Sequence, residues 1–193
     1  VEPFSCGYYA AQKADNLDAS DTVIVFGAGP IGLGVVAAAN AKGARVIIAE
    51  PSQARIEVAK KLGAESSFDP SAADAVEQAM KLTDGKGATV VFEASGKPQA
   101  MAMTFQVAAF RARLVNIGIN VGDSATAELG LIQSKELQVR GIIGSPGVWP
   151  ETIRFLAKTG IDLSPLVTKQ FDIADAASAY EAVLNDKSQI KVH

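Results

Sequence analysis

Apolar runs and helical patterns alternate along most of the chain. Strands are predicted from the apolar runs at residues 22–27, 45–50, 65–69, 89–96, 112–119 and 137–144. Between them, apolar positions recur at helical spacing and predict helices over residues 30–44, 52–64 and 97–110, and a helix followed by turn residues over 71–88. A helix over 150–160, a strand over 166–173, a helix over 174–186 and a short strand over 189–192 complete the pattern. This alternation indicates a parallel sheet with helices on both faces.

The predicted strands are continuous apolar runs, as expected for strands that are covered on both faces. Six strands in two halves favour an α/β Rossmann fold, a doubly wound parallel sheet with strand order 3-2-1-4-5-6. The chain has 193 residues, which suits a single domain. The longest irregular stretch is residues 118–129.

Three glycines stand at the junction between the first strand and the helix that follows it. Gly27 allows a tight turn, Gly29 lets a pyrophosphate approach the backbone, and Gly32 lets the helix lie near the strand. Pro30 and Ile31 occupy the first helical turn. Because a helix start presents free N–H groups and a positive dipole end, we expect these residues to hold the phosphates of a dinucleotide.

An acid, Glu50, ends the second predicted strand, where a carboxylate faces the adenosine ribose in this geometry. Its charge repels a 2′-phosphate, and the next residues, Pro51 and Ser52, are not basic, so NAD is favoured over NADP. A methyl donor with an adenosine group remains an alternative ligand. Arg55 either stacks on the adenine or is a solvated cation paired with Glu57 or nearby acids.

Two later strand ends carry further candidates. Ala94 and Ser95 follow the fourth predicted strand, and Gly118 follows the fifth. Both strand ends lie beside the point where the strand order reverses, which is where ligands bind in such sheets. We expect these residues to surround the nicotinamide half of the cofactor, although ordinary strand-terminating turns remain an alternative.

Composition limits the kinds of binding partner and the cellular compartment that we expect for this chain. The net charge is −3, which argues against a nucleic-acid surface. No apolar run is long enough to span a membrane. A single cysteine, Cys6, excludes an internal disulfide and fits a reducing compartment, so we expect a cytoplasmic protein. The opening residues are not typical of a signal peptide, and the missing initial Met suggests a processed chain or part of a longer one.

The combined motifs resemble the medium-chain dehydrogenase/reductase superfamily, in its zinc-dependent alcohol and polyol branch, which includes sorbitol and threonine dehydrogenases. The resemblance rests on residues 2–14, 23–34, 90–96, 139–160 and 163–183. It implies that residues 1–193 form one NAD(P)-binding Rossmann domain, with 1–20 as an inter-domain helix region, and that the GroES-like catalytic domain is absent. It further implies a parent enzyme that transfers a hydride from a small alcohol or polyol to NAD. The parent enzyme is also expected to form a homo-oligomer, either a dimer or a tetramer.

In such enzymes zinc polarises the substrate alcohol, and the resemblance places its ligands in the absent domain. Zinc sites need several Cys, His or carboxylate ligands, whereas this chain has one cysteine, Cys6, and one histidine, His193, at opposite ends. Glu2 matches a glutamate of the polyol branch's zinc site, but alone we expect it to be a surface acid. We therefore expect neither a metal site nor catalytic residues in this chain, and we expect no turnover from it alone.

One turn departs from the resemblance. The family often has paired glycines before the fifth strand, where this chain has Arg111, Ala112 and Arg113. We expect a turn of different shape there, with Arg113 as a surface charge. A second function class also remains open, namely a stand-alone NAD-binding module that senses redox state or regulates a partner without catalysis.

Overall fold

In the computed structural model, which describes residues 1–186 and 188–193, the main sheet has six parallel strands in the order β3-β2-β1-β4-β5-β6. This confirms the predicted order. The strands are β1 (Thr22–Phe26), β2 (Arg45–Ala49), β3 (Ala64–Phe68), β4 (Ala88–Glu93), β5 (Ala108–Asn116) and β6 (Gln138–Gly141). The order reverses between β1 and β4, so their carboxyl ends define the switch point of the fold.

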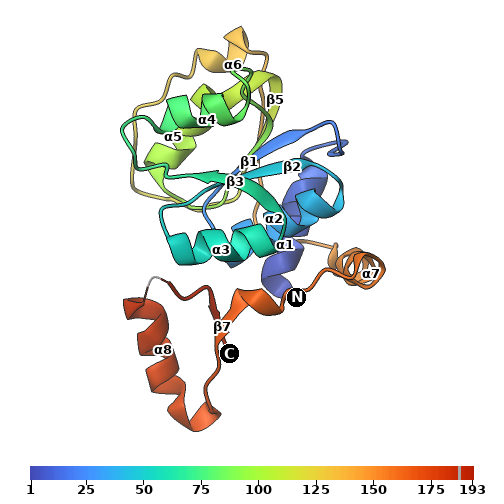
Figure 1. Cartoon of the computed structure of the whole chain (residues 1–193), viewed down its shortest axis with the longest axis vertical. Coiled ribbons are helices and arrows are strands. Elements are labelled where there is room, and N and C mark those ends of the chain that lie inside the picture. The colour runs from blue at the N-terminus through green and yellow to red at the C-terminus, as the bar shows by residue number, and fades with distance from the viewer. Residues whose placement is uncertain (187) are drawn as a thin grey trace.

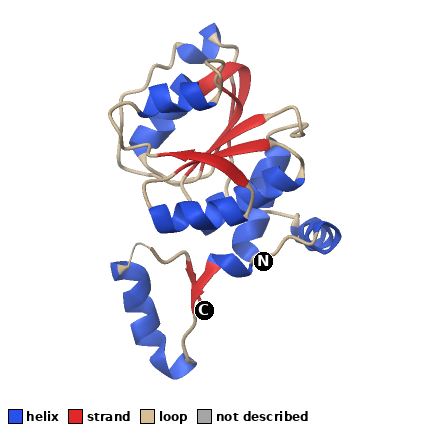
Figure 2. Ribbon diagram, viewed as in Figure 1, coloured by secondary structure: helices blue, strands red, loops and turns tan. Residues whose placement is uncertain are grey.

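Helices cover both faces of this sheet, as Figures 1 and 2 show. The helices are α1 (Glu2–Lys13), α2 (Pro30–Ala41), α3 (Gln53–Lys61), α4 (Ala75–Leu82), α5 (Pro98–Val107), α6 (Leu131–Ser134), α7 (Trp149–Thr159) and α8 (Ala176–Asn185). Side chains of β1 alternate between the faces: Val23 and Val25 pack with α1 and α2, and Ile24 and Phe26 pack with α4 and α5. The apolar runs are therefore buried on both faces. None of the described helices is long and apolar enough to span a bilayer.

Helix α1 lies directly against α2. A Cβ atom built on Gly7 would lie 2.6 Å from the carbonyl carbon of Gly34, so this approach depends on the missing side chain. Phe4 of α1 stacks with Phe155 of α7, and Tyr8 of α1 contacts the same ring at a tilt, which extends the packing on this side of the sheet. Helix α1 falls within the segment 1–20 that was expected to hold a helix.

The C-terminal residues extend away from the Rossmann sheet (Figure 1). Two short turns of 3₁₀-helix, Ser164–Leu166 and Ile173–Asp175, flank β7 (Val167–Lys169), which pairs in parallel with β8 (Lys191–Val192). We call β7 and β8 the C-terminal ribbon. Two side chains next to it, Leu166 and Ile190, are buried in the core on the α1 and α2 side. Among the described residues of α8, by contrast, none is buried.

Several predicted boundaries were wrong. Residues 108–110 were expected to end a helix, but they begin β5, and Ala108 pairs with Ala88 of β4 before a shift in register. Within 71–88, predicted as a helix followed by turn residues, the helix α4 begins only at Ala75, and the expected strand over 166–173 shortens to β7. The predicted strand over 137–144 shortens to β6, whose four residues are exposed because β6 forms the edge of the sheet.

The turn before the fifth strand also differs from the prediction. Arg111 adopts a φ of 60°, in the left-handed region that favours glycine, so its backbone has the conformation that a glycine would adopt freely. Arg113 is not a surface charge. Its guanidinium pairs with the buried carboxylate of Asp21 and donates hydrogen bonds to the carbonyls of Ala14 and Asp15 at the end of α1.

Candidate functional site

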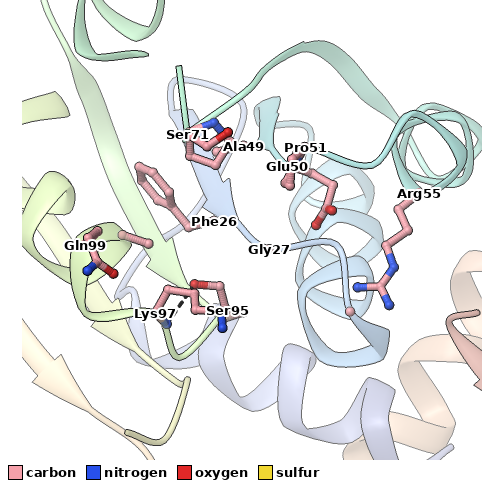
Figure 3. Close-up of a pocket in the computed structure, with 14 residues that line it drawn as sticks. Phe26, Gly27, Ala49, Glu50, Pro51, Arg55, Ser71, Ser95, Lys97 and Gln99 are labelled. Atoms are coloured by element: carbon pink, nitrogen blue, oxygen red, sulfur yellow. Dashed lines mark hydrogen bonds between the residues drawn. The ribbon is translucent and has the colours of Figure 1, made fainter. Parts of the chain in front are cut away.

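A pocket of about 720 Å³ opens at the switch point, beside the carboxyl ends of β1, β2 and β4 (Figure 3). It is lined by Phe26, Gly27, Gly29, Ala49, Glu50, Pro51, Arg55, Pro70, Ser71, Ala94, Ser95, Lys97, Gln99 and Ala100. Six of these are predicted site residues: Gly27, Gly29, Glu50, Arg55, Ala94 and Ser95. The pocket therefore gathers residues from distant parts of the chain at the place where the fold binds ligands.

The glycine turn has the geometry that its spacing predicts. Gly27 has a φ of 91°, and a Cβ there would lie 2.9 Å from the Cα of Ser95. A Cβ on Gly32 would lie 1.9 Å from the carbonyl oxygen of Gly27, so α2 packs against the turn only without a side chain. A Cβ on Gly29 would meet no heavy atom within 4 Å in the part of the chain that the structure describes. The space above Gly29 is thus open to a ligand.

The start of α2 faces this open space. Gly29 is the N-cap residue, and among the described residues no side chain caps the helix. Pro30 and Ile31 form the first turn, as predicted, although they do not stand among the pocket-lining residues. An uncapped helix start presents backbone N–H groups that need acceptors, and an anion with several oxygens supplies them.

Glu50 lies at the end of β2 with its side chain turned toward the glycine turn (Figure 3). One carboxylate oxygen accepts a hydrogen bond of 2.8 Å from the backbone N–H of Ala28, and the other accepts one of 3.1 Å from Ser52. Only 6% of Glu50 is exposed, so these bonds hold an acceptor group in one orientation at the pocket wall. Each oxygen keeps further lone pairs that can accept hydroxyl donors from a ligand.

Arg55 reaches from α3 to the same pocket (Figure 3). One of its terminal nitrogens, Nη2, donates a hydrogen bond of 2.8 Å to the carbonyl of Gln189, next to the C-terminal ribbon. Its Nε is buried and has no hydrogen-bond partner among the described residues. Pairing with Glu57 was the wrong alternative, because Glu57 instead pairs with Lys60 at 3.0 Å. Arg55 therefore brings an unsatisfied cationic donor to the site.

A buried acid shapes the wall formed by the end of β4. Glu93 is fully buried, and one of its oxygens accepts hydrogen bonds from the N–H and hydroxyl of Ser95, at 2.8 and 2.5 Å, and from the N–H of Gly96, at 3.1 Å. Gly118 packs beneath this turn, where a Cβ would lie 2.2 Å from the nitrogen of Gly96. Gly118 does not line the pocket, so its contact with nicotinamide stays a prediction.

Sequence reasoning missed Glu93 and several lining residues. Glu93 stands inside an otherwise apolar run of the sequence. Because a carboxylate is rarely buried without hydrogen-bond donors around it, this position could have indicated a structured turn after the strand. Pro70 and Ser71 follow β3, and Lys97 and Gln99 lie just after the turn that ends β4. Their position after parallel strands would have placed them at the same edge of the sheet.

The described residues do not fit a zinc site. Among the described residues, no three His, Cys, Asp or Glu side chains lie close enough together to hold a metal ion. Glu2 accepts a contact of 3.5 Å from the thiol of Cys6, and burial raises the pKa of that thiol. The backbone of His193 pairs with Lys169 beside the C-terminal ribbon.

Residues 30–158 match the model of the family described as zinc-binding dehydrogenase. The chain belongs to this family. It is 31% identical over 190 residues to sorbitol dehydrogenase of Bacillus subtilis, covering 98% of this chain and 54% of that protein. It is 37% identical over 153 residues to L-threonine 3-dehydrogenase of Pyrococcus abyssi, covering 78% of this chain and 44% of that protein. The chain thus spans about half the length of these zinc-binding dehydrogenases.

Solved structures agree with this assignment. The fold matches 2R,3R-butanediol dehydrogenase from Bacillus subtilis with a TM-score of 0.88 at 31% identity, covering 99% of this chain and 55% of that one. It matches an alcohol dehydrogenase from Escherichia coli CFT073, complexed with the cofactor NADH, with a TM-score of 0.90 at 26% identity, covering 99% of this chain and 56% of that one. The chain corresponds to the Rossmann, cofactor-binding half of the medium-chain zinc-binding dehydrogenases.

Proposed function

We propose that this chain binds NAD(H) as the coenzyme-binding domain of a zinc-dependent alcohol or polyol dehydrogenase. The observation that carries the proposal is the meeting of an open glycine turn, an uncapped helix start and the fixed carboxylate of Glu50 at one pocket. The NADH complex of a structural relative supports it. The parent enzyme then transfers a hydride between a secondary alcohol and the nicotinamide ring, which is chemistry that the cofactor itself supplies when bound.

Each part of the pocket has a task in this proposal. The first turn of α2, with Gly29, Pro30 and Ile31, holds the pyrophosphate on its N–H groups. Glu50 accepts hydrogen bonds from the adenosine ribose hydroxyls. Ala94 and Ser95 border the space that the nicotinamide half enters, and the bonds of Ser95 to Glu93 fix the shape of that border.

We infer a preference for NAD over NADP from the environment of Glu50. Its two bonds to backbone N–H groups hold the carboxylate beside the place of the ribose. A 2′-phosphate there would face a like charge in a partly desolvated site, which disfavours binding.

We propose that zinc and the substrate of the whole enzyme are held by residues outside this chain, because the chain itself lacks a fitting ligand set among the described residues. Relatives act on sorbitol, butanediol and erythritol or L-threitol by their names, which favours a small alcohol or polyol as the substrate class. The cytoplasmic location and the inter-domain role of residues 1–20 stay predictions.

We also propose a homo-oligomer joined through β6. Within the described part of the chain this strand pairs with β5 alone, all four of its residues are exposed, and Ile143 just beyond it is 77% exposed. An unpaired, partly apolar edge strand is a template for pairing with another chain. Light scattering of the 193-residue chain after gel filtration tests this proposal, and a monomer at micromolar concentration contradicts it.

Calorimetric titration of the chain with NADH and NADPH tests the main proposal. Replacing Glu50 by Ala removes hydrogen bonds made by a charged group, each worth about 1.5–3 kcal/mol, so NADH binding weakens about 10- to 100-fold. NADPH binding weakens less or strengthens, because the like charge is gone. Glu57→Ala, an exposed acid on α3, is the matched control and leaves both affinities unchanged. Equal loss of both cofactors, or tighter binding of S-adenosylmethionine than of NADH, contradicts the proposal.

A further inference from the structure

Arg55 connects the pocket with the C-terminal ribbon. The side chain lines the pocket, while its Nη2 donates to the backbone carbonyl of Gln189, 134 residues further along the chain. Because a long, flexible arginine side chain has many rotamers in solution, a fixed acceptor at one end of the guanidinium limits where the other nitrogens point. The position of Gln189 therefore helps to decide the direction of the Arg55 Nε donor.

Gln189 is itself held firmly from the ribbon. Its side-chain oxygen accepts a hydrogen bond of 2.8 Å from the hydroxyl of Thr168 in β7, and its side-chain amide donates one of 2.7 Å to Asp186. The same Thr168 hydroxyl accepts a hydrogen bond of 3.1 Å from the N–H of Ile190, whose side chain is buried in the core. Thr168 thus fixes both the side chain of Gln189 and the backbone just after it.

The Nε of Arg55 leaves a hydrogen bond unmade. This nitrogen is buried and has no partner among the described residues, and the side chain that carries it lines the pocket. A buried donor that lacks an acceptor is unfavourable, and an oxygen or ring nitrogen of a bound molecule removes that cost. The Nε and the Nη2 that bonds to Gln189 belong to the same rigid, planar guanidinium of Arg55. A hydrogen bond that fixes Nη2 therefore also orients Nε.

We propose that Thr168 and Gln189 are positioning residues for cofactor binding, which orient Arg55 toward the adenosine half of NAD. This inference rests on the proposed function and adds a coupling between the pocket and the C-terminal ribbon. Since coupling of two equilibria is reciprocal, an ordered ribbon strengthens binding of NADH, and bound NADH orders the ribbon to the same extent.

A double-mutant cycle on the 193-residue chain, with NADH affinity as the readout, tests the coupling. Arg55→Leu weakens NADH binding about 10- to 100-fold, because a charged donor is lost. Thr168→Val keeps the shape of the side chain, removes the hydroxyl, and weakens binding about 3- to 10-fold through the loosened Arg55. In the Arg55→Leu background, Thr168→Val changes the affinity by less than about 1.5-fold, because the group through which it acts is absent.

Three further measurements separate positioning from general loss of structure. Thr168→Ser keeps the hydroxyl and restores wild-type affinity. Thr159→Val, the same substitution at an exposed threonine that bonds only within α7, leaves affinity unchanged. Hydrogen exchange of the Ile190 amide slows when NADH binds to the wild-type chain, and does not slow in Arg55→Leu at saturating NADH.

The outcomes distinguish this inference from the proposed function. If the wild-type chain does not bind NADH, both are overturned. If it binds NADH and responds to Glu50→Ala, but the effects of Arg55→Leu and Thr168→Val simply add, the coupling is overturned and the proposed function stands. A non-additive cycle together with ligand-dependent protection of Ile190 supports the coupling.

Discussion

Replacing Arg113 by Met should be among the most damaging substitutions away from the pocket. The guanidinium pairs with Asp21, whose side chain is 6% exposed, while that of Arg113 is 19% exposed. Without Arg113, Asp21 keeps neutral donors, the hydroxyl of Thr89 at 2.7 Å and the N–H of Asp18 at 3.1 Å. Among the described residues, no other cationic side chain forms an ion pair with Asp21 that would compensate its charge.

The size of the effect follows from that burial. Breaking a buried ion pair by removing one partner costs about 3–5 kcal/mol, and the residual exposure of Arg113 places the expected loss near the lower end, about 3 kcal/mol. A chain of this length loses about 2–4 °C in Tm for each kcal/mol, so Tm falls by about 6–12 °C. Because a typical domain is stable by only about 5–15 kcal/mol, this loss is a large share of the total.

Urea unfolding followed by circular dichroism measures this loss. The matched control is Arg111→Met, two residues away, where the side chain is 70% exposed and pairs with the exposed Glu136. Exposed pairs contribute about 0–1 kcal/mol, so the control stays close to wild type. Adding Asp21→Asn to Arg113→Met removes the uncompensated charge and recovers part of the stability. Equal, small losses for Arg113→Met and Arg111→Met would refute the reasoning.

Two further predictions concern the glycine turn and the C-terminal turn. Gly29→Ala leaves Tm nearly unchanged, because its Cβ meets open space. The same substitution weakens NADH binding at least about 10-fold, because the methyl group occupies the place of the pyrophosphate. Gly32→Ala instead lowers Tm, because its Cβ would lie 1.9 Å from the Gly27 oxygen. Hydrogen bonds from Ser188 and Gln189 hold the pKa of Asp186 at about 2, below its ordinary value of 3.8. These bonds therefore stabilise the fold above pH 4, and the stabilisation is lost as the pH falls toward 2. An NMR titration of the Asp186 carboxyl carbon measures this pKa, and a midpoint near 4 contradicts the prediction.

The central strands and their order were predictable because their signals are local. The runs at β1, β2 and β4 are continuous and apolar. A continuous apolar run is the pattern typical of a strand that is buried on both faces, so the run alone predicts the strand. The geometry of the glycine turn and the position of Glu50 were predictable for a related reason, since both depend on a short segment with fixed spacing. Their pocket lies where the order of the strands reverses.

The remaining features depend on partners that lie far away in the sequence. Residues 108–110 were predicted as the end of a helix, but the pairing of β5 with β4 begins at Ala108, because tertiary contacts override a weak local preference. The partner of Arg113 is 92 residues away and that of Arg55 is 134 residues away, so neither pairing has a spacing signature. The exposed edge at β6 likewise follows from the position of the strand in the sheet rather than from its composition.

The contact between Gly7 and Gly34 has a mechanical consequence. No side chain separates the two helices at this point, and a Cβ added to Gly7 would lie 2.6 Å from the carbonyl carbon of Gly34. A larger residue at position 7 would therefore force α1 away from α2. Because α2 begins at the glycine turn, such a substitution displaces the helix whose first amides are proposed to hold the diphosphate.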